Sequence, residues 1–435
     1  MPPSESLVRG FFPFRRLLVC LLALLCASPS PLVAYSVLSH ESIIDSAWKT
    51  DIRPLLLKRF PDASHDELRQ AHACAYGGAI IQDLGYYPHG NKLFSDLTHY
   101  VRSGDFIQAL LRDANSLCEY AFALGALAHY ASDNEGHRLA VNRAVPLLYP
   151  SLRKKYGDFV TYEQDPAAHL KTEFGFDVVE VAQGRFAPDA YRDFIGFEVA
   201  QSILDRAFAD TYGLQLGPLL RDETRAIESY RHVISSTIPK ATRVAWALKK
   251  DEIQRDVPGT TREKFLYNIS RASYEKRWGK NYRAPTAGEK FLAFFSRLIP
   301  KIGPLKALAF HAPTPQAEHM FEQSFNTTLT RYREMLSDYD RGRLELVNDN
   351  FDVGAVTAPG QYRLADAGYA ALLDRLSRQN FAGTSAELRS DLLRFYSDPS
   401  APYATRKNRK AWRRLQDDLQ RLEAFQPSAS KAETH

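Results

Sequence analysis

Cysteine is scarce in this chain, which has four in 435 residues. Two of them, Cys20 and Cys26, lie in an apolar N-terminal stretch, so the remainder has only Cys74 and Cys118 and can form at most one disulfide. Both lie in Ala-rich, helical-looking sequence, where a buried free thiol and a bridge are equally compatible with the pattern. This scarcity excludes a small disulfide-held scaffold, so stability must come from a core or from metals.

A surplus of one charge is also missing. The 56 Lys and Arg residues nearly balance the 51 Asp and Glu residues, giving a formal net charge of +5, which does not argue for a polyanionic partner. Alternating apolar and polar runs are rare, whereas apolar residues recur at helical spacing between turn-like stretches. With 45% hydrophobic residues, the sequence predicts a globular, mostly α-helical protein with a sizeable core.

A long apolar run is missing even at the N-terminus. Arg9, Arg15 and Arg16 precede LLVCLLALLCA, which is shorter than the roughly 20 residues that a membrane-spanning helix needs. This pattern is typical of a secretory signal peptide over residues 1–34, cleaved between Ala34 and Tyr35. We expect a secreted or periplasmic protein whose mature chain begins with the free amino group of Tyr35.

The rest divides into three regions by composition. Residues 35–184 hold the densest set of histidines and carboxylates, 185–425 form a further helical region of unknown role, and 426–435 form a disordered tail. Within the second region, 313–343 is an amphipathic helix candidate and 344–364 is a loop or a short hairpin. The basic segment KNRKAWRRLQDDLQRLEAF predicts a terminal amphipathic helix packed on the body, with peripheral membrane contact as the alternative. The oligomeric state is left open.

What the sequence does contain is the motif HYASDNEGH. Its residues His129, Asp133 and His137 are four positions apart in proline-free, Leu- and Ala-rich sequence, so a helix would align them on one face. Such a stripe is either a metal site, because imidazole and carboxylate are ordinary zinc ligands, or a partly buried polar face that is paired internally. Further candidate ligands decide between the two. They are His40, Asp83, His99 and the i, i+4 pair of His169 and Glu173.

In this order, the groups resemble the ligand series of the zinc-dependent phospholipase C family and its relatives, the fungal single-strand-specific nucleases. The resemblance covers roughly the first 150 mature residues. Tyr35 stands where the family usually has Trp, three residues separate Asp133 from His137 where the family usually has five, and the interval from His137 to His169 is longer than usual. The resemblance implies two to three zinc ions bound by Tyr35, His40, Asp83, His99, His129, Asp133, His137, His169 and Glu173.

The resemblance also implies a mechanism. Asp133 would bridge two zinc ions, whose shared water ionises near neutral pH and attacks a phosphodiester, with Asp83 orienting it. His137, His169 and Glu173 would hold a third ion at the leaving group. We expect a phospholipase C-type hydrolase; the alternatives are a single-strand-specific zinc nuclease and a non-catalytic, zinc-stabilised helical envelope protein. Leu84 follows Asp83 where choline-selective members have an aromatic residue, which argues against choline specificity.

Overall fold

The computed structural model describes residues 37–183, 197–232 and 311–427, together with a few isolated positions between 246 and 261. These residues form helices joined by turns, with one isolated antiparallel bridge between Asn350 and Ala355 and no β-strand in the described ranges. The expectation of a mostly α-helical fold is confirmed. The α-helices are α2 (Val37–Ala47), α3 (Arg53–Arg59), α4 (His65–Ile80), α5 (Lys92–Tyr100), α6 (Ser103–Asp113), α7 (Leu117–Gly136), α8 (Asn142–Leu148), α9 (Pro150–Tyr156), α10 (Pro166–Gln183), α12 (Gln201–Tyr212), α13 (Leu216–Leu220), α14 (Glu223–His232), α18 (Pro315–Asp340), α19 (Arg363–Arg378), α20 (Ala386–Phe395) and α21 (Arg409–Ala424).

Four short helical turns of other types connect these helices. They are the π-helical turns η1 (Trp48–Ile52) and η3 (His137–Val141) and the 3₁₀ turns η2 (Ile81–Tyr86) and η6 (Ala404–Lys407). The expected signal peptide and Tyr35 lie outside the described residues, as do most of the 426–435 tail and most of the stretch between α14 and α18. In the described part of the chain, no helix combines the length and the apolar character needed to cross a membrane.

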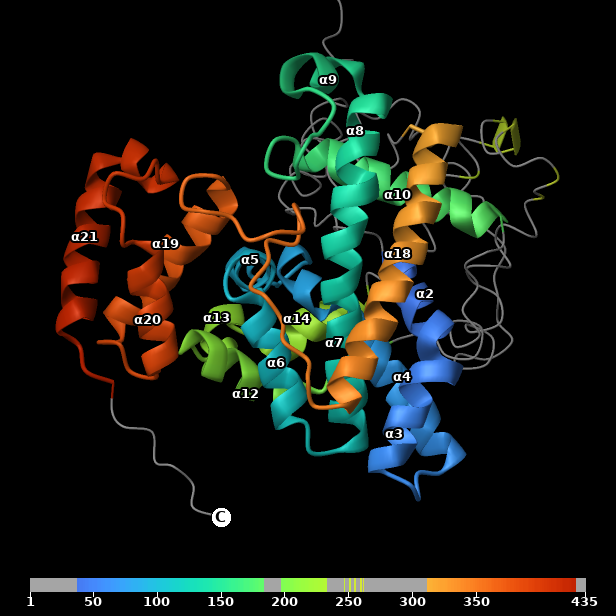
Figure 1. Ribbon diagram of the computed structural model, residues 1–435, viewed down its shortest axis with the longest axis horizontal. Helices are drawn as coiled ribbons and strands as arrows, with labels where there is room; N and C mark the ends of the chain where they lie inside the picture. Colours follow the sequence, from blue (N-terminus) through green and yellow to red (C-terminus); the bar gives the residue numbers. More distant parts are fainter. Residues whose placement is uncertain are drawn as a thin grey trace, which may run out of the picture.

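Helix α7 is the central element of the fold, and α2, α4, α6 and α18 all pack against it (Figure 1). It begins at Ser116, whose side chain accepts a hydrogen bond from the backbone N–H of Glu119 and so caps the first turn. Nearly every side chain from Tyr120 to Asn134 is buried, so α7 is enclosed on all sides rather than amphipathic. Polar side chains on such a helix must be satisfied inside the protein.

Helices α4 and α7 approach each other closely because glycine occupies their crossing. A Cβ atom added to Gly78 would lie 1.9 Å from the carbonyl oxygen of Phe122, and one added to Gly125 would lie 2.0 Å from that of Ala75. A disulfide between Cys74 and Cys118 joins the same two helices. The sequence left the state of these cysteines open, and the structure resolves it as a bridge.

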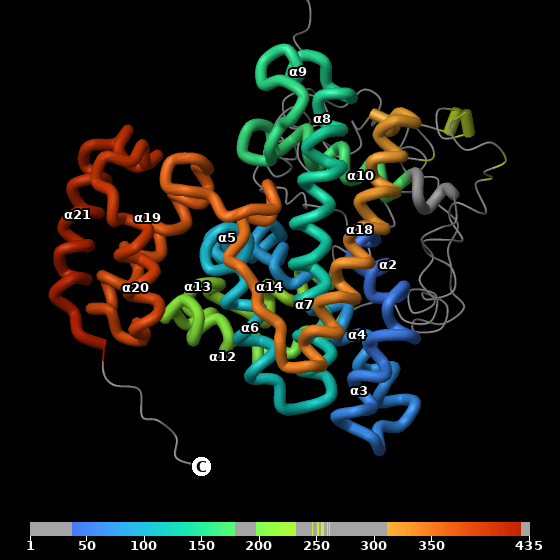
Figure 2. The backbone as a smooth tube through the Cα atoms, in the orientation of Figure 1, coloured from blue at the N-terminus to red at the C-terminus, as the bar shows by residue number. Residues whose placement is uncertain are grey.

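The C-terminal helices extend the same core. The candidate helix at 313–343 is confirmed as α18, which starts at the Thr314 cap and packs along α7. After α18, the chain crosses back over α6 and α7 without regular structure and then enters α19 to α21 (Figure 2). Of the region 344–364, residues 344–362 are thus a loop with a single bridge, and residues 363–364 begin α19. Helix α21 packs on α19 through the buried Leu415 and Leu422, as the terminal amphipathic pattern predicts.

The crossing of α4 and α7 generates a stability prediction. Ala is a better helix former than Gly by about 1 kcal/mol, yet Gly125→Ala should lower the free energy of unfolding by roughly 1–3 kcal/mol, because its methyl group overlaps the backbone of α4. Denaturant unfolding followed by circular dichroism measures this change. Gly217→Ala on α13 is the matched control, since a Cβ there meets nothing within 4 Å. Equal stability of the two variants would show that α4 and α7 can separate at no cost.

Candidate metal centre

Eight of the nine residues expected as ligands lie within the described residues, and the structure buries all of them. Each is at most 3% exposed. They come from five parts of the fold: His40 from α2, Asp83 from η2, His99 from α5, His129, Asp133 and His137 from α7 and its junction with η3, and His169 and Glu173 from α10. The structure brings them together as two groups. The Asp133 group contains His40, Asp83, His99, His129 and Asp133; the Glu173 group contains His137, His169 and Glu173.

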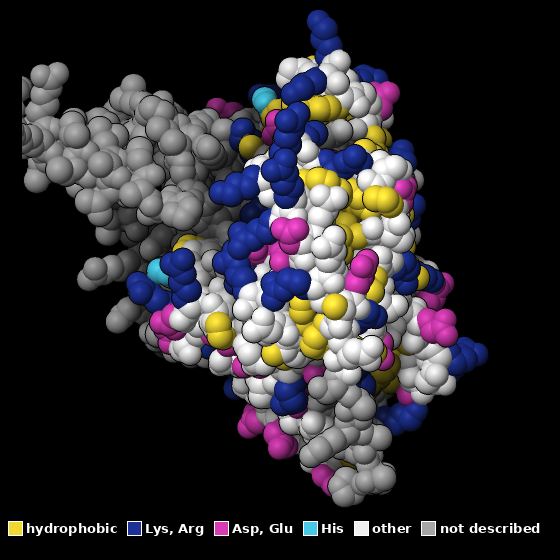
Figure 3. Space-filling view, turned by 90° about the vertical axis from the view of Figure 1, so that its left-hand side faces the viewer, with side chains coloured by type: hydrophobic (Ala, Val, Ile, Leu, Met, Phe, Trp, Pro, Cys, Tyr) yellow, Lys and Arg dark blue, Asp and Glu magenta, His cyan; other side chains and the backbone are white. Residues whose placement is uncertain are grey.

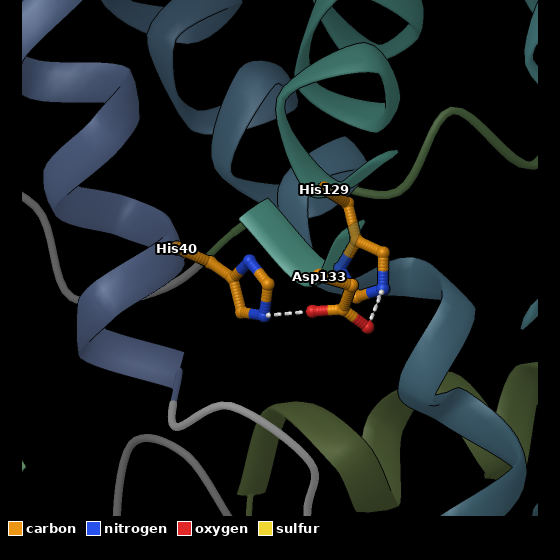
Figure 4. A group of neighbouring side chains, drawn as sticks. All are labelled: His40, His129 and Asp133. Carbon is orange, nitrogen blue, oxygen red and sulfur yellow. Dashed lines mark ion pairs between the residues drawn. The ribbon is translucent and has the colours of Figure 1, made fainter. Parts of the chain in front are cut away.

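The carboxylate of Asp133 lies between imidazoles from two sides. Its Oδ1 is 3.4 Å from Nε2 of His40, and its Oδ2 is 3.2 Å from Nε2 of His129 (Figure 4). Oδ2 is also 3.4 Å from Nε2 of His99. One carboxylate oxygen thus faces α2 and the other faces α5 and α7, which is the arrangement that a bridging ligand requires.

Asp83 completes the side of the group formed by α5 and α7. Its Oδ1 lies 3.4 Å from Nε2 of His99, and that nitrogen is 3.3 Å from Nε2 of His129. Among the described residues, neither Asp83 nor Asp133 receives a hydrogen bond of regular geometry. Buried carboxylates without such partners are costly unless a cation compensates them.

These spacings fit zinc. Zinc–nitrogen and zinc–oxygen bonds of about 2.0–2.1 Å at tetrahedral angles place neighbouring ligand atoms about 3.3–3.4 Å apart. The distances of 3.2 to 3.4 Å among His40, His99, His129, Asp83 and Asp133 match this edge length. The donor set of imidazole nitrogens and carboxylate oxygens is also the one that zinc prefers, so the residues present fit the metal.

In the Asp133 group, the second nitrogen of two imidazoles is fixed by a backbone carbonyl. Nδ1 of His129 lies 2.9 Å from the Ala79 oxygen, and Nδ1 of His99 lies 2.8 Å from the Ser95 oxygen. These nitrogens must carry the proton, because a carbonyl can only accept. In the neutral ring, which is the form that binds a metal, Nε2 is then the nitrogen with the lone pair, and it is the one directed into the Asp133 group.

Burial and neighbouring charges shift the pKa values of the Asp133 group in opposite directions. Burial lowers the pKa of His99, but the polar contacts of its Nε2 with the carboxylates of Asp133 and Asp83 outweigh it and raise that pKa to about 10. Burial raises the pKa of Asp133, but the charge of His129 and the side-chain contacts with His129 and His99 outweigh it and hold that pKa well below its usual range. Both shifts favour positive charge on an imidazole beside an ionised Asp133, and a zinc ion bound to the neutral imidazoles would supply that positive charge instead.

The Glu173 group is wider. Oε1 of Glu173 lies 4.0 Å from Nε2 of His137 and 3.9 Å from Nδ1 of His169, about half an ångström beyond a tetrahedral zinc edge. Nε2 of His169 lies 2.6 Å from the Val160 carbonyl oxygen, so its Nδ1 is the nitrogen available to a metal. The short spacing between Asp133 and His137 is thus compatible with His137 reaching α10, from the point where α7 passes into a π-helical turn.

Sequence reasoning missed two buried residues at the centre, Phe351 and Asp352. The ring of Phe351 lies 5.4 Å from that of His99, and Oδ1 of Asp352 lies 3.2 Å from Nδ1 of His137. Both belong to the irregular segment after α18, where no periodicity assigns a direction to a side chain. Outside the centre, His72 is paired with a carboxylate, since its Nε2 lies 2.9 Å from Asp45 Oδ1.

The described residues therefore define an all-helical protein with a buried histidine and carboxylate centre suited to zinc. Residues 39–219 match the family model of zinc dependent phospholipase C, so this part of the chain is similar to that family. All eight described ligand candidates lie inside the matched segment. The comparisons with curated proteins and with solved structures gave no match.

The position of Asp133 generates a prediction about metal content. Asp133→Ala should lose more than one zinc ion per chain, because one carboxylate faces both halves of its group. Zinc content is measured by elemental analysis of the purified protein. Asp45→Ala is the matched control, since it removes a carboxylate paired with an imidazole outside the centre. Retention of the full zinc content in Asp133→Ala would rule out bridging.

Proposed function

We propose that this protein is an exported zinc-dependent phosphodiesterase that hydrolyses phospholipid headgroups in the manner of a phospholipase C. The observation that carries the proposal is the convergence of five buried imidazole and carboxylate side chains at 3.2 to 3.4 Å spacing, inside the segment that matches the family. Zinc bound there supplies Lewis-acid activation of a water molecule and of the phosphoryl group.

The positions of the side chains suggest a different role in the reaction for each. Asp133 holds the two halves of its group at a fixed separation, because its two oxygens face His40 and His129. Asp83 is placed to orient the attacking water and to accept its proton, because burial raises the pKa of its carboxyl group above the usual value. The Glu173 group is the candidate for holding positive charge near the leaving oxygen.

The surroundings of the centre do not favour a choline headgroup. One of the aromatic rings beside His99 is that of Tyr86, with centroids 5.9 Å apart. A second contact already occupies this ring, since Nζ of Lys92 lies 6.0 Å from its centroid. A quaternary ammonium group would compete with this lysine for the ring, so we place other phospholipids ahead of choline lipids.

Export would also assemble part of the centre. Removal of residues 1–34 would give Tyr35 a free amino group, which binds zinc far better than an amide does. The start of α2 is held against α10, because the backbone N–H of Leu38 and the hydroxyl of Ser39 both donate to Asp177 at 3.3 and 2.8 Å. Asp177 lies one helical turn beyond Glu173, so the first turn of α2 is anchored to the helix that carries the Glu173 group.

The proposed function is tested with a protein whose first residue is Tyr35, confirmed by mass spectrometry. It should hydrolyse phospholipid vesicles and a chromogenic phosphodiester, lose this activity with chelator and regain it with zinc. Asp83→Asn should retain helical content and slow turnover by at least about a hundredfold, as losses of oriented catalytic groups commonly do. A version with extra residues before Tyr35 should also be slower.

Two outcomes of this experiment would replace the proposal. Chelator-sensitive cleavage of single-stranded nucleic acid with no action on phospholipid would make the protein a nuclease. Zinc content without turnover of any substrate would make it a non-catalytic, zinc-stabilised envelope protein.

We further propose that the C-terminal region contacts anionic lipid surfaces. Figure 3 views the side on which α21 lies and shows Lys and Arg side chains gathered on that face. No acidic residue occurs from 399 to 416, a stretch that contains η6 and the first half of α21. Its exposed cations are Arg406, Lys407, Arg409, Lys410, Arg413 and Arg414. Each such cation near an anionic bilayer contributes about 1 kcal/mol of attraction.

Vesicle sedimentation tests this contact. Lys407→Gln, Lys410→Gln and Arg413→Gln together should weaken binding to phosphatidylserine vesicles by about a hundredfold at low salt and leave binding to phosphatidylcholine vesicles unchanged. The matched control replaces the exposed Arg153, Lys154 and Lys155 of α9 with Gln. Equal losses in the two triple variants would mean that net charge, not this face, governs binding.

A further inference from the structure

The segment 346–354 crosses α6 and α7 and is tied to both; we name it the strap (Figure 1). The hydroxyl of Tyr130 on α7 donates to the backbone oxygen of Val347 and to Oδ2 of Asp349, each at 3.0 Å. The hydroxyl of Ser103 on α6 donates to the backbone oxygen of Asp349 at 2.6 Å. The strap therefore has a fixed register on the helices that form the centre.

At its inner end the strap reaches the candidate ligands. The backbone N–H of Phe351 donates to the backbone carbonyl oxygen of His99 at 3.1 Å. The side-chain amide of Asn142 donates to the backbone carbonyl oxygen of Asp352 at 2.6 Å. These two bonds place the side chains of Phe351 and Asp352 against different groups. Phe351, fully buried, contacts the rings of His99 and His129 in the Asp133 group. Asp352 contacts His137 in the Glu173 group.

The carboxylate of Asp352 is held by one oxygen and presents the other. Oδ2 accepts the backbone N–H of Tyr162 and the hydroxyl of Tyr362, both at 2.8 Å. Oδ1 lies 3.2 Å from Nδ1 of His137, and the side chain is 2% exposed. The opposite nitrogen of the same ring, Nε2, is the one that faces Glu173 at 4.0 Å.

His137 thus differs from the other oriented histidines. His99, His129 and His169 each have their second nitrogen on a backbone carbonyl, whereas His137 has it on a carboxylate. A carboxylate behind a metal-binding imidazole fixes which nitrogen carries the proton and increases the basicity of the other. It also compensates charge at a group whose ligand atoms are more widely spaced than those of the Asp133 group.

We propose that Asp352 is a positioning residue of the Glu173 group: it accepts the proton on Nδ1 of His137 and thereby directs Nε2 toward a zinc ion shared with His169 and Glu173. This inference rests on the proposed zinc-dependent function. It gives the region beyond the family match, which ends at residue 219, a direct part in the metal centre.

Asp352→Asn tests the proposal by reversing the polarity of the group that faces Nδ1 of His137 at 3.2 Å. The amide oxygen can still accept from Tyr162 and Tyr362, so the amide nitrogen must face His137, where it can only donate. The ring proton then moves to Nε2 and blocks metal binding there. In competition with a chromophoric chelator, wild type should bind three zinc ions, and Asp352→Asn should bind one of them about 10- to 100-fold more weakly, with the other two unchanged.

Asp349→Asn is the matched control. It removes a carboxylate from the same strap, but this carboxylate accepts a hydrogen bond from Tyr130 and does not contact a candidate ligand. Its zinc affinities should equal those of wild type. If Asp352→Asn does not fold by circular dichroism, Tyr362→Phe decides the question. It keeps the carboxylate, removes one of its two anchors, and should weaken the same ion severalfold.

Each remaining outcome is decisive. Unchanged affinity for all ions in a folded Asp352→Asn, or in Tyr362→Phe where it is the deciding variant, overturns the role of Asp352. A wild type that binds only two ions and hydrolyses phosphodiesters overturns this role but leaves the proposed function standing. A wild type that binds no zinc and has no turnover overturns both.

Discussion

The burial of Asp133 is the constraint on which the rest of the structure depends. A carboxylate on a fully enclosed helix loses its hydration, and this loss must be offset by positive charge and hydrogen bonding from neighbouring elements. Imidazoles from α2, α5 and α7 itself surround it at 3.2 to 3.4 Å, so α2 and α5 must both approach one point on α7. The small residues along α7, and the glycines at its crossing with α4, permit that approach. The disulfide between Cys74 and Cys118 fixes the same pair of helices away from the metal centre.

The position of α4 matters for the chemistry because α4 leads directly into η2. The backbone carbonyl oxygen of Ala79, near the end of α4, accepts a hydrogen bond from Nδ1 of His129. Asp83 follows on η2. A shift of α4 along α7 would therefore move both the proton acceptor behind one ligand and the carboxylate of another. The contact between α4 and α7 therefore determines both the close packing of their backbones and the orientation of the candidate ligands. A mutation at this crossing is expected to affect both stability and metal affinity.

The sequence predicted those parts of the structure that local periodicity determines. The spacing of His129, Asp133 and His137 predicted one helical face, and the order of the histidines and carboxylates predicted a zinc-dependent family. It could not predict the pairing of Cys74 with Cys118, because the distance between two helices is set by packing rather than by spacing. Asp352 was missed for a similar reason. It lies in an irregular segment far along the chain, and only the tertiary path of the strap brings it to His137.

The family match and the folded unit have different extents, and this difference has a physical basis. The match covers residues 39–219, yet one hydrophobic core also includes residues of α18, α19 and α21. Helix α18 lies along α7, and the strap that follows it supplies Phe351 and Asp352 to the interior. The matched segment carries the candidate imidazole and carboxylate ligands, whereas the carboxylate that faces Nδ1 of His137 comes from outside it. The later segment fills that position, so the two parts of the chain are joined by the electrostatics of the centre as well as by apolar packing.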